Sequence, residues 1–443
     1  MRLLRITLQN YRRFEKFDIH LHPELTVIAA RNGQGKTTIL EAIAASLGPF
    51  VGAFESGRSE HIRRTDARYF VQPDSFENEQ SFPVIIDSEM TDPVIQWQRA
   101  LQSPKGRTTT KEAAPLADWG KRLQQELRVN ADVVLPVLRY YSSKRLWVSH
   151  KNTTRKAILT ESRTAGYEDC LSSLSSFVQL QEWVKTATQA EQQQRELPGY
   201  EKSNLKARLN GIKYAVDTVM AEEGWSNFHY SFVYDELAMT HPDHGALPIS
   251  LLSDGVRAMI SLAADLALRC VRLNGFLGES APLKSPGIVL IDEVDLHLHP
   301  AWQQRVVLAL RKAFPKLQFI ISSHSPQVLS TVKSECIRVV FRNSDGDWLA
   351  QSPDEEVLGR ESAIALNLVM GVNPIPPIEE ARLIADYIAI IENGDDETSE
   401  GRALREKLLA IYGKGNPVLS DADKLIRFQK FKLRQSAIEK GQD

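Results

Sequence analysis

Residues 30–38, with the sequence ARNGQGKTT, place glycines, a lysine and two threonines between an apolar run and a helical pattern. Gly35, Lys36 and Thr37 match the end of the phosphate loop G-x-x-x-x-G-K-[ST]. In such a loop, backbone N–H groups cradle the phosphates, the lysine reaches the β- and γ-phosphates, and the hydroxyl ligates Mg²⁺. We therefore predict that the loop binds ATP and Mg²⁺ through Asn32, Gly33, Gly35, Lys36, Thr37 and Thr38.

Ala30 occupies the place of the first glycine in this pattern. If the position needs a left-handed backbone, an alanine there costs about 1–2 kcal/mol, which is small beside several phosphate contacts. We therefore expect the substitution to be tolerated. The alternative is an ordinary glycine-rich turn before a helix, and a second signal is needed to decide between the two.

The second signal is the run IVLIDE, residues 288–293, in which two carboxylates end a strand-like segment. Asp292 can hold Mg²⁺ through water, and Glu293 can polarise the attacking water as a general base. The alternative is an acidic pair that only caps the edge of a sheet. Because the phosphate loop lies in the same chain, we predict that Glu293 is catalytic and that Thr37 and Asp292 hold the metal.

Two further segments complete the candidate site. His324, in SSHSP (322–326), follows an apolar run and could hydrogen-bond to a γ-phosphate as a second catalytic residue, although a lone histidine is more often structural. Ser253 and Gly255, in LLSDG (251–255), begin a helical pattern, whose free N–H groups attract phosphate. A serine at this place is also a common helix cap.

Short apolar segments must position these side chains. Residues 24–30, 287–294 and 317–324 are continuous apolar runs of the kind found in buried parallel strands. A helical apolar spacing follows the phosphate loop and ends at Gly48–Pro49. Strands alternating with helices predict an α/β fold.

The order of the four motifs resembles that of the ABC-type ATPases, and more narrowly that of the recombination and SMC-like ATPases of the AAA family. The resemblance implies an ABC-type ATPase head, with a two-lobed mixed sheet and flanking helices. It also implies that Leu252–Gly255 is a signature motif supplied across a dimer to the partner's nucleotide, and that His324 is the switch histidine. The segment LQNYRRF (8–14) is similar to the same branch, in which Arg12 or Arg13 would lie near the nucleotide.

We expect this head to be interrupted and extended by helical regions. Lobe I, with the phosphate loop, takes residues 1–100, and lobe II, with the other three motifs, takes 227–345. A mainly helical insertion, 101–226, separates them and is too short and too broken for long coiled-coil arms. Residues 346–443 form a helical C-terminal region that could dock a partner. It ends in the basic amphipathic segment DKLIRFQKFKLRQ (423–435), whose charges could also be merely solvated.

The segment LPVLRYYSSKRLW (135–147) resembles one found in ATPases of prokaryotic anti-phage systems, although it could be only a strand and a basic turn. Together with HLHP (297–300) and the helical tail, it looks like the PtuA family of Septu systems, which also occurs with some retrons. The resemblance implies a homodimer or higher even oligomer that hydrolyses ATP to ADP and phosphate. It further implies an HNH nuclease, PtuB, as partner, with DNA or RNA, or a retron reverse transcriptase and its msDNA, as further partners.

Two other functions stay open at this point. A RecF-like ATPase of DNA repair would bind DNA directly, and a nucleotide-sensing scaffold would bind ATP with little hydrolysis. NSDGDW (343–348) reads as a hairpin turn and not as an acidic metal cluster, so we expect no nuclease site in this chain.

The composition is that of an ordinary globular protein. The 443 residues carry a formal net charge of −2, so any contact with nucleic acid needs a local basic patch. Three scattered cysteines, Cys170, Cys270 and Cys336, suit a reducing compartment. We find no signal peptide and no apolar stretch of bilayer length, and we therefore expect a cytoplasmic protein without a membrane partner.

Overall fold

The computed structural model describes residues 1–71, 78–143, 162–172, 177–195 and 204–440. The chain forms two compact units, Met1–Gly371 and Val372–Asp443. The strands are β1 Arg2–Tyr11, β2 Phe14–His20, β3 Leu25–Ala29, β4 Arg68–Val71, β5 Asn78–Ser81, β6 Val84–Thr91, β7 Ile95–Leu101, β8 Val137–Tyr141, β9 Ser226–Ser231, β10 Glu236–His241, β11 Gly245–Pro248, β12 Gly287–Ile291, β13 Leu317–Ser323, β14 Ile337–Arg342 and β15 Trp348–Gln351. The helices are α1 Lys36–Val51, α2 Ala114–Val129, α3 Phe177–Gln194, α4 Leu205–Met220, α5 Asp254–Leu273, α6 Ala281–Lys284, α7 Pro300–Gln303, α8 Val306–Ala313, α9 Pro326–Leu329, α10 Ser362–Met370, α11 Glu379–Asn393, α12 Ser399–Tyr412 and α13 Pro417–Lys440.

A six-stranded sheet forms the centre of the first unit, in the order β15-β14-β3-β13-β12-β8. Five of its strands run parallel, and β15 returns antiparallel to β14. Every residue of β3, β12 and β13 is buried, because helices or a second sheet cover both faces. The three continuous apolar runs are therefore parallel strands, as predicted.

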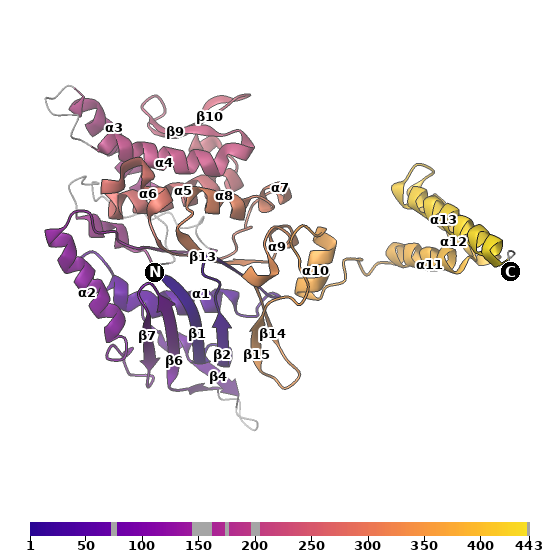
Figure 1. Cartoon of the computed structure of the whole chain (residues 1–443), viewed down its shortest axis with the longest axis horizontal. Helices are drawn as coiled ribbons and strands as arrows, with labels where there is room; N and C mark the ends of the chain where they lie inside the picture. Colours follow the sequence, from indigo (N-terminus) through magenta and orange to yellow (C-terminus); the bar gives the residue numbers. More distant parts are fainter. Residues whose placement is uncertain (72–77, 144–161, 173–176, 196–203, 441–443) are drawn as a thin grey trace. The chain divides into compact units, whose positions relative to one another are not determined.

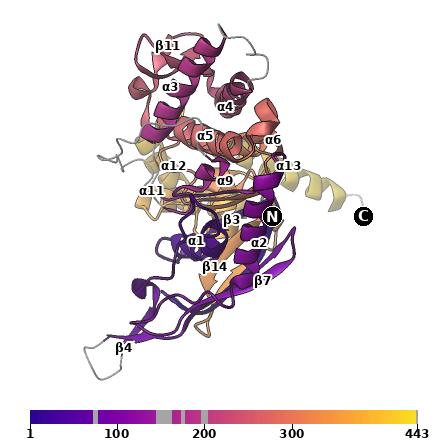
Figure 2. The same ribbon diagram turned by 90° about the vertical axis from the view of Figure 1, so that its left-hand side faces the viewer.

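A four-stranded antiparallel sheet, β2-β1-β6-β7, lies on one side of this centre (Figures 1 and 2). Helix α1 contacts β6 of this sheet and also β12 and β13 of the central sheet. The Gln318 side chain of β13 joins the sheets directly, since its amide donates to the Leu3 carbonyl at 2.8 Å and accepts from the Leu3 N–H at 2.8 Å. The phosphate-loop helix is thus held between two sheets.

Helices α4, α5, α6 and α8 lie on the other side of β13 from β1, β6 and β7 (Figure 1). A small antiparallel sheet, β11-β10-β9, packs on α3 and α4 through β9. The first unit is therefore an α/β head with a mixed set of sheets and flanking helices, which confirms the predicted fold class.

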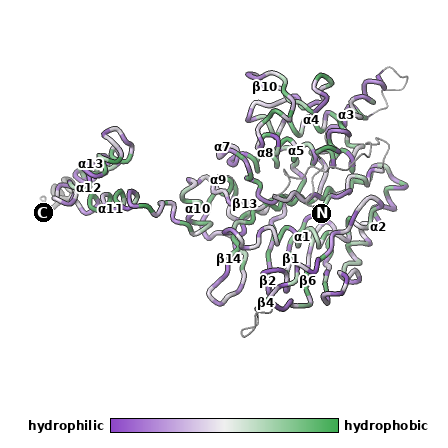
Figure 3. Tube along the Cα trace, turned by 180° about the vertical axis from the view of Figure 1, so that it is seen from behind, coloured by the Kyte–Doolittle hydropathy of each residue, from purple (hydrophilic) through white to green (hydrophobic). Residues whose placement is uncertain are grey.

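The second unit has a small core of its own. Its buried residues are Tyr387, Ile391, Leu408, Leu419 and Ala422, from α11, α12 and α13. Apolar and polar positions alternate along these helices (green and purple in Figure 3), as expected for amphipathic helices that share one core. The C-terminal region is thus helical over the residues that form this unit.

Two strands lie inside regions for which we expected helices. The range 101–226 contains α2, α3 and α4, but its strand β8 pairs with β12 as an edge of the central sheet. The range after 345 begins with β15, which pairs with β14 across the predicted hairpin, Arg342 opposite Trp348. The first compact unit accordingly runs on to Gly371. Residues 144–147 of the segment RYYSSKRLW lie outside the described residues.

Strands β8 and β12 approach each other closely at Gly287. A Cβ atom on Gly287, whose φ is +154°, would lie 1.9 Å from the Val137 carbonyl oxygen. We expect Gly287→Ala to destabilise the protein by about 3 kcal/mol or more, because the backbone of two paired strands cannot move aside. Urea unfolding followed by tryptophan fluorescence measures this change.

Gly245→Ala is the matched control. Gly245 also has a positive φ of +71°, but no atom lies within 4 Å of the added Cβ. It should cost only about 1 kcal/mol of backbone strain. Equal losses in the two variants would show that the approach of β8 to β12 is not tight.

Candidate functional site

Three neighbouring parallel strands end at the same edge of the central sheet. Ala29 at the end of β3 pairs with Ser323 at the end of β13, and Ile321 of β13 pairs with Ile291 at the end of β12. In open α/β sheets, ligands bind at this carboxyl edge. The phosphate loop, the Asp292–Glu293 pair and His324 follow these three strands directly, so all three motifs meet there.

The phosphate loop needs its two remaining glycines. Gly33 and Gly35 have φ values of +75° and +98°. A Cβ on Gly35 would lie 2.6 Å from Phe14 Cζ and 2.9 Å from Arg13 Cδ. Ala30 is buried and is not among the described non-glycine residues with positive φ. The strain that we considered for Ala30 therefore does not arise.

Lys36 is buried at the start of α1, with 6 % of its surface exposed. Its Nζ donates to the Ala30 carbonyl at 3.2 Å and also contacts His324 Nε2. Burial lowers the pKa of Lys36, while the carboxylates of Asp292, Glu293 and Asp295 act in the opposite direction. The ammonium group thus lies at the strand edge among acceptors, in a place where phosphate oxygens could replace them.

Thr37 and Asp292 meet at the same edge. Thr37 Oγ1 donates to Asp292 Oδ2 at 2.8 Å, and Ser322 Oγ donates to Asp292 Oδ1 at 2.6 Å. Asp292 is fully buried, so its carboxylate depends on such partners. A hydroxyl and a carboxylate so placed fit a hard cation that prefers oxygen ligands, such as Mg²⁺.

Glu293, the residue after Asp292, has an unusual backbone conformation. Its φ is +49°, which is uncommon for a residue with a side chain, and its N–H donates to Ser322 Oγ at 2.8 Å. Ser322 therefore orients both acidic residues, a role that the sequence reasoning missed although the residue stands in SSHSP. The Glu293 side chain is half-buried, whereas that of Asp292 is fully buried.

The two candidate arginines, Arg12 and Arg13, have different contacts in the structure. Arg12 pairs with Asp66 at 2.8 Å and with Glu41. Arg13 Cδ lies 2.9 Å from the position that a Cβ atom on Gly35 would take. The Arg13 guanidinium carbon lies 5.2 Å from the centre of the Trp348 ring. Arg13 is therefore the arginine beside the phosphate loop, and Arg12 is held by carboxylates.

Ser253 is the N-cap residue of helix α5, and Gly255 lies in its first turn. Ser253 is exposed at the N-cap position, yet its side chain makes no capping hydrogen bond. A Cβ on Gly255 would lie 2.5 Å from the His297 carbonyl, so the helix start packs on the loop after Glu293. Among the hydrogen bonds of the described residues, none joins either residue to residues 30–38.

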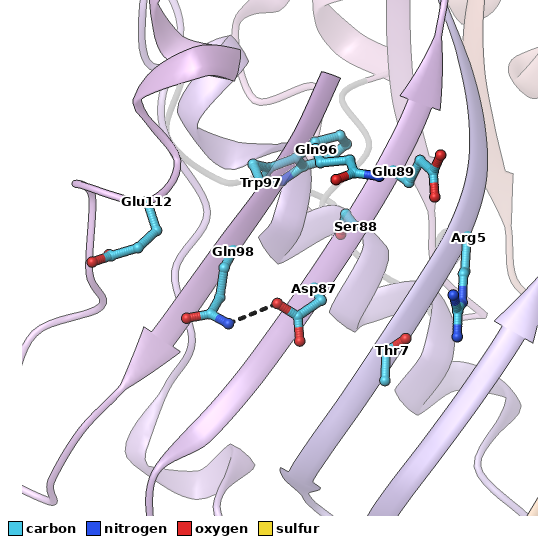
Figure 4. Close-up of a pocket in the computed structure, with 9 residues that line it drawn as sticks. All are labelled: Arg5, Thr7, Asp87, Ser88, Glu89, Gln96, Trp97, Gln98 and Glu112. Carbon is cyan, nitrogen blue, oxygen red and sulfur yellow. Dashed lines mark hydrogen bonds between the residues drawn. The ribbon is translucent and has the colours of Figure 1, made fainter. Parts of the chain in front are cut away.

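A separate polar hollow of about 420 Å³ lies on the antiparallel sheet (Figure 4). In it Gln98 Nε2 donates to Asp87 Oδ1 at 2.7 Å. The residues that line it are Arg5, Thr7, Asp87, Ser88, Glu89, Gln96, Trp97, Gln98 and Glu112. None of them belongs to the four motifs, so this hollow is not part of the candidate site.

Comparison with known proteins identifies the class of this chain. A family model described as "AAA domain" matches residues 5–215, and one described as "AAA domain, putative AbiEii toxin, Type IV TA system" matches residues 158–330. Together they include the phosphate loop, Asp292, Glu293 and His324. The chain therefore carries AAA-type ATPase domains over residues 5–330, as its motifs predict.

Individual proteins of known type are similar to this chain in sequence or in structure. The "Retron Vc95 probable ATPase" of Vibrio cholerae serotype O1 biovar El Tor is 26 % identical, over 92 % of this chain and 86 % of its own. The "Septu protein PtuA" of Bacillus thuringiensis is 22 % identical, over 94 % of each chain. An SMC head solved bound to the C-winged helix domain of ScpA is 16 % identical, covers 80 % of this chain and 97 % of that chain, and has a TM-score of 0.47. Over most of its length, this chain is therefore similar to the retron and Septu ATPases.

In the part of the chain that the structure describes, no helix is both long enough and apolar enough to cross a bilayer.

The contact between Lys36 and His324 predicts a pH dependence of stability. Burial and the Lys36 charge lower the pKa of His324, so the unfolded chain takes up a proton at higher pH than the folded chain. Stability contributed by neutral His324 is therefore present above about pH 6.5 and is lost as the pH falls through the lowered pKa. We expect the melting temperature of the wild type to fall more between pH 7.5 and 5.5 than that of His324→Gln.

His244→Gln, at an exposed turn, controls for the loss of an imidazole. Its melting temperature should follow the wild type across this range. A wild type and a His324→Gln variant with parallel pH curves would show that His324 does not titrate against Lys36.

Proposed function

We propose that the chain binds Mg²⁺-ATP between Lys36 of one copy and Ser253 of a second copy, hydrolyses it, and thereby controls a partner nuclease in anti-phage defence. The observation that carries this proposal is the meeting of Lys36, Thr37, Asp292 and His324 at one sheet edge. All four groups belong to one copy of the chain. The other side of a triphosphate would be open to a second copy.

Helix α5 is suited to cover that open side. It has 20 residues, and its first N–H groups carry the positive end of the helix dipole. Ser253 at its N-cap is exposed, and its hydroxyl is not used for capping. Gly255 lets the helix start lie close to the backbone of the loop after Glu293. The proposed site therefore requires a homodimer or a higher even oligomer.

Each residue then has a chemical role. The loop N–H groups and Lys36 bind the phosphates, and Arg13 lies beside the loop as a further cation. Thr37 and Asp292 would hold Mg²⁺, which when bound neutralises phosphate charge. Glu293 polarises the attacking water, and His324 hydrogen-bonds to the γ-phosphate once Lys36 has turned to ATP.

The proposed partner is an HNH nuclease of the PtuB kind. The resemblance to Septu and retron ATPases supports it, and so does the second unit, where Phe428 and Phe431 are 61 % and 58 % exposed on α13. Arg427 and Lys432 flank them. We propose that residues 372–443 dock the partner, and that the protein works in the cytoplasm with DNA or RNA, or a retron reverse transcriptase and its msDNA, as its further partners.

Glu293→Gln tests the proposed reaction. The variant should bind ATP, release phosphate at least about 100-fold more slowly because the base is lost, and accumulate as an ATP-bound dimer. Phosphate release and mass by light scattering measure the two effects. Glu335→Gln, an exposed carboxylate elsewhere, should behave as the wild type. Undiminished phosphate release by Glu293→Gln would exclude Glu293 as the base, and absence of turnover in the wild type would favour a nucleotide-sensing scaffold.

The double variant Phe428→Ala, Phe431→Ala tests the docking unit. Immobilised wild-type chain should capture a purified PtuB-type nuclease, and the double variant should bind it at least about tenfold more weakly, since two exposed aromatic anchors are removed. Phe70→Ala, at another exposed phenylalanine, is the control. Equal capture by all three proteins would place the docking surface elsewhere, and hydrolysis stimulated by DNA alone, with steep salt dependence, would favour the DNA-repair function.

A further inference from the structure

A buried ionic cluster joins strand β8 to helix α5. Asp265 of α5 accepts three hydrogen bonds on one oxygen, Oδ2: from Arg139 Nε at 3.0 Å, Tyr141 Oη at 2.7 Å and Arg269 Nε at 3.2 Å. Arg139 and Tyr141 come from β8 and are almost completely buried. The cluster therefore fixes the middle of α5 to the edge of the central sheet.

The charges in this cluster are compensated by the chain around it. Burial raises the pKa of Asp265, but the charges of Arg269 and Arg139 and the Tyr141 hydrogen bond outweigh it and hold the pKa at about 2. The cluster has two guanidinium groups for one carboxylate, and both guanidinium groups also donate to backbone carbonyls of residues 166–169. Arg139 Nη1 donates to the Asp169 carbonyl at 2.9 Å, and Arg269 Nη1 donates to the carbonyls of Gly166 and Glu168 at 2.8 and 3.1 Å.

The cluster is in direct contact with the candidate site. The Tyr141 carbonyl accepts a hydrogen bond from the Asp292 N–H at 2.8 Å, while the Tyr141 hydroxyl holds Asp265. Asp292 in turn holds Thr37. One residue of β8 thus touches the site through its backbone and α5 through its side chain.

Helix α5 carries this connection to Ser253. Asp265 lies 12 residues after Ser253, which is about 18 Å along an α-helix. Near its start, the helix also rests on the His297 carbonyl at Gly255. A rigid helix attached at both places holds Ser253 at a set position relative to Asp292.

Stability alone does not account for the cluster. Replacing a buried ion pair by apolar residues of similar size is often neutral or stabilising, so ionic groups are weak evidence for stability. Their distinctive property is direction, since two donors of β8, Arg139 and Tyr141, are aimed at one oxygen of α5 and allow few relative orientations of the two elements.

We propose that Asp265 is a positioning residue for the reaction: by tying α5 to Tyr141 and Arg139 of β8, it sets where Ser253 stands relative to Asp292. This inference rests on the proposed function, in which Ser253 completes the site of a second copy. Loosening the cluster should leave ATP binding at Lys36 intact and should impair closure of the dimer and turnover.

Tyr141→Phe and Asp265→Asn test the inference. Tyr141→Phe removes only the hydroxyl and keeps the ring under Arg139, whose guanidinium lies 4.7 Å from the ring centre. We expect ATP affinity within about twofold of wild type, turnover reduced at least tenfold, and faster hydrogen exchange of the amides of residues 256–262. Glu191→Gln, which removes the charge of a buried carboxylate of α3 that pairs with the exposed Arg195, is the matched control and should change none of these.

Ser253→Arg separates this inference from the proposed function. If Ser253→Arg abolishes turnover and Tyr141→Phe does not change turnover or exchange in α5, only the positioning role is overturned. If Ser253→Arg turns over as the wild type does, the shared site is wrong and the inference fails with it. Loss of ATP affinity in parallel with turnover in folded Tyr141→Phe would also overturn it, because the cluster would then act on the phosphate loop and not on α5.

Discussion

The candidate site depends on the register of three parallel strands. Pairing of β3, β13 and β12 brings the residues that follow each strand to one edge, where Thr37 and Ser322 satisfy the carboxylate of Asp292. A fully buried carboxylate is costly without such partners, and a slip by one residue would turn these side chains to the opposite face. The same register therefore stabilises the fold and assembles the site.

The local part of this arrangement could be predicted from the sequence. Continuous apolar runs predicted the buried parallel strands, and the glycine pattern predicted the loop between β3 and α1, because each signal depends on neighbouring residues only. The departure at Ala30 could be recognised but not evaluated. Its backbone is not left-handed, so the position does not need the glycine that the pattern asks for.

The remainder depends on contacts between residues far apart in the chain. Arg12 and Arg13 are alike in sequence, and the positions of Glu41 and of Asp66, which is 54 residues away, show that Arg12 is already paired. The bonds from Arg139 and Tyr141 to Asp265 span 126 and 124 residues. The strand β8 itself contains a buried arginine, which a search for apolar helices and strands does not favour, and so a sheet edge was included in a helical insertion.

The central claim is that a triphosphate binds where the three strands end. Calorimetric titration of ATP with Mg²⁺ into wild type, Lys36→Met and Lys316→Met tests it most directly, since Lys316 is an exposed lysine just before β13. We expect one ATP per chain for wild type and Lys316→Met, and roughly 100-fold weaker binding for Lys36→Met because a charged phosphate contact is lost. Wild-type affinity in Lys36→Met would contradict it.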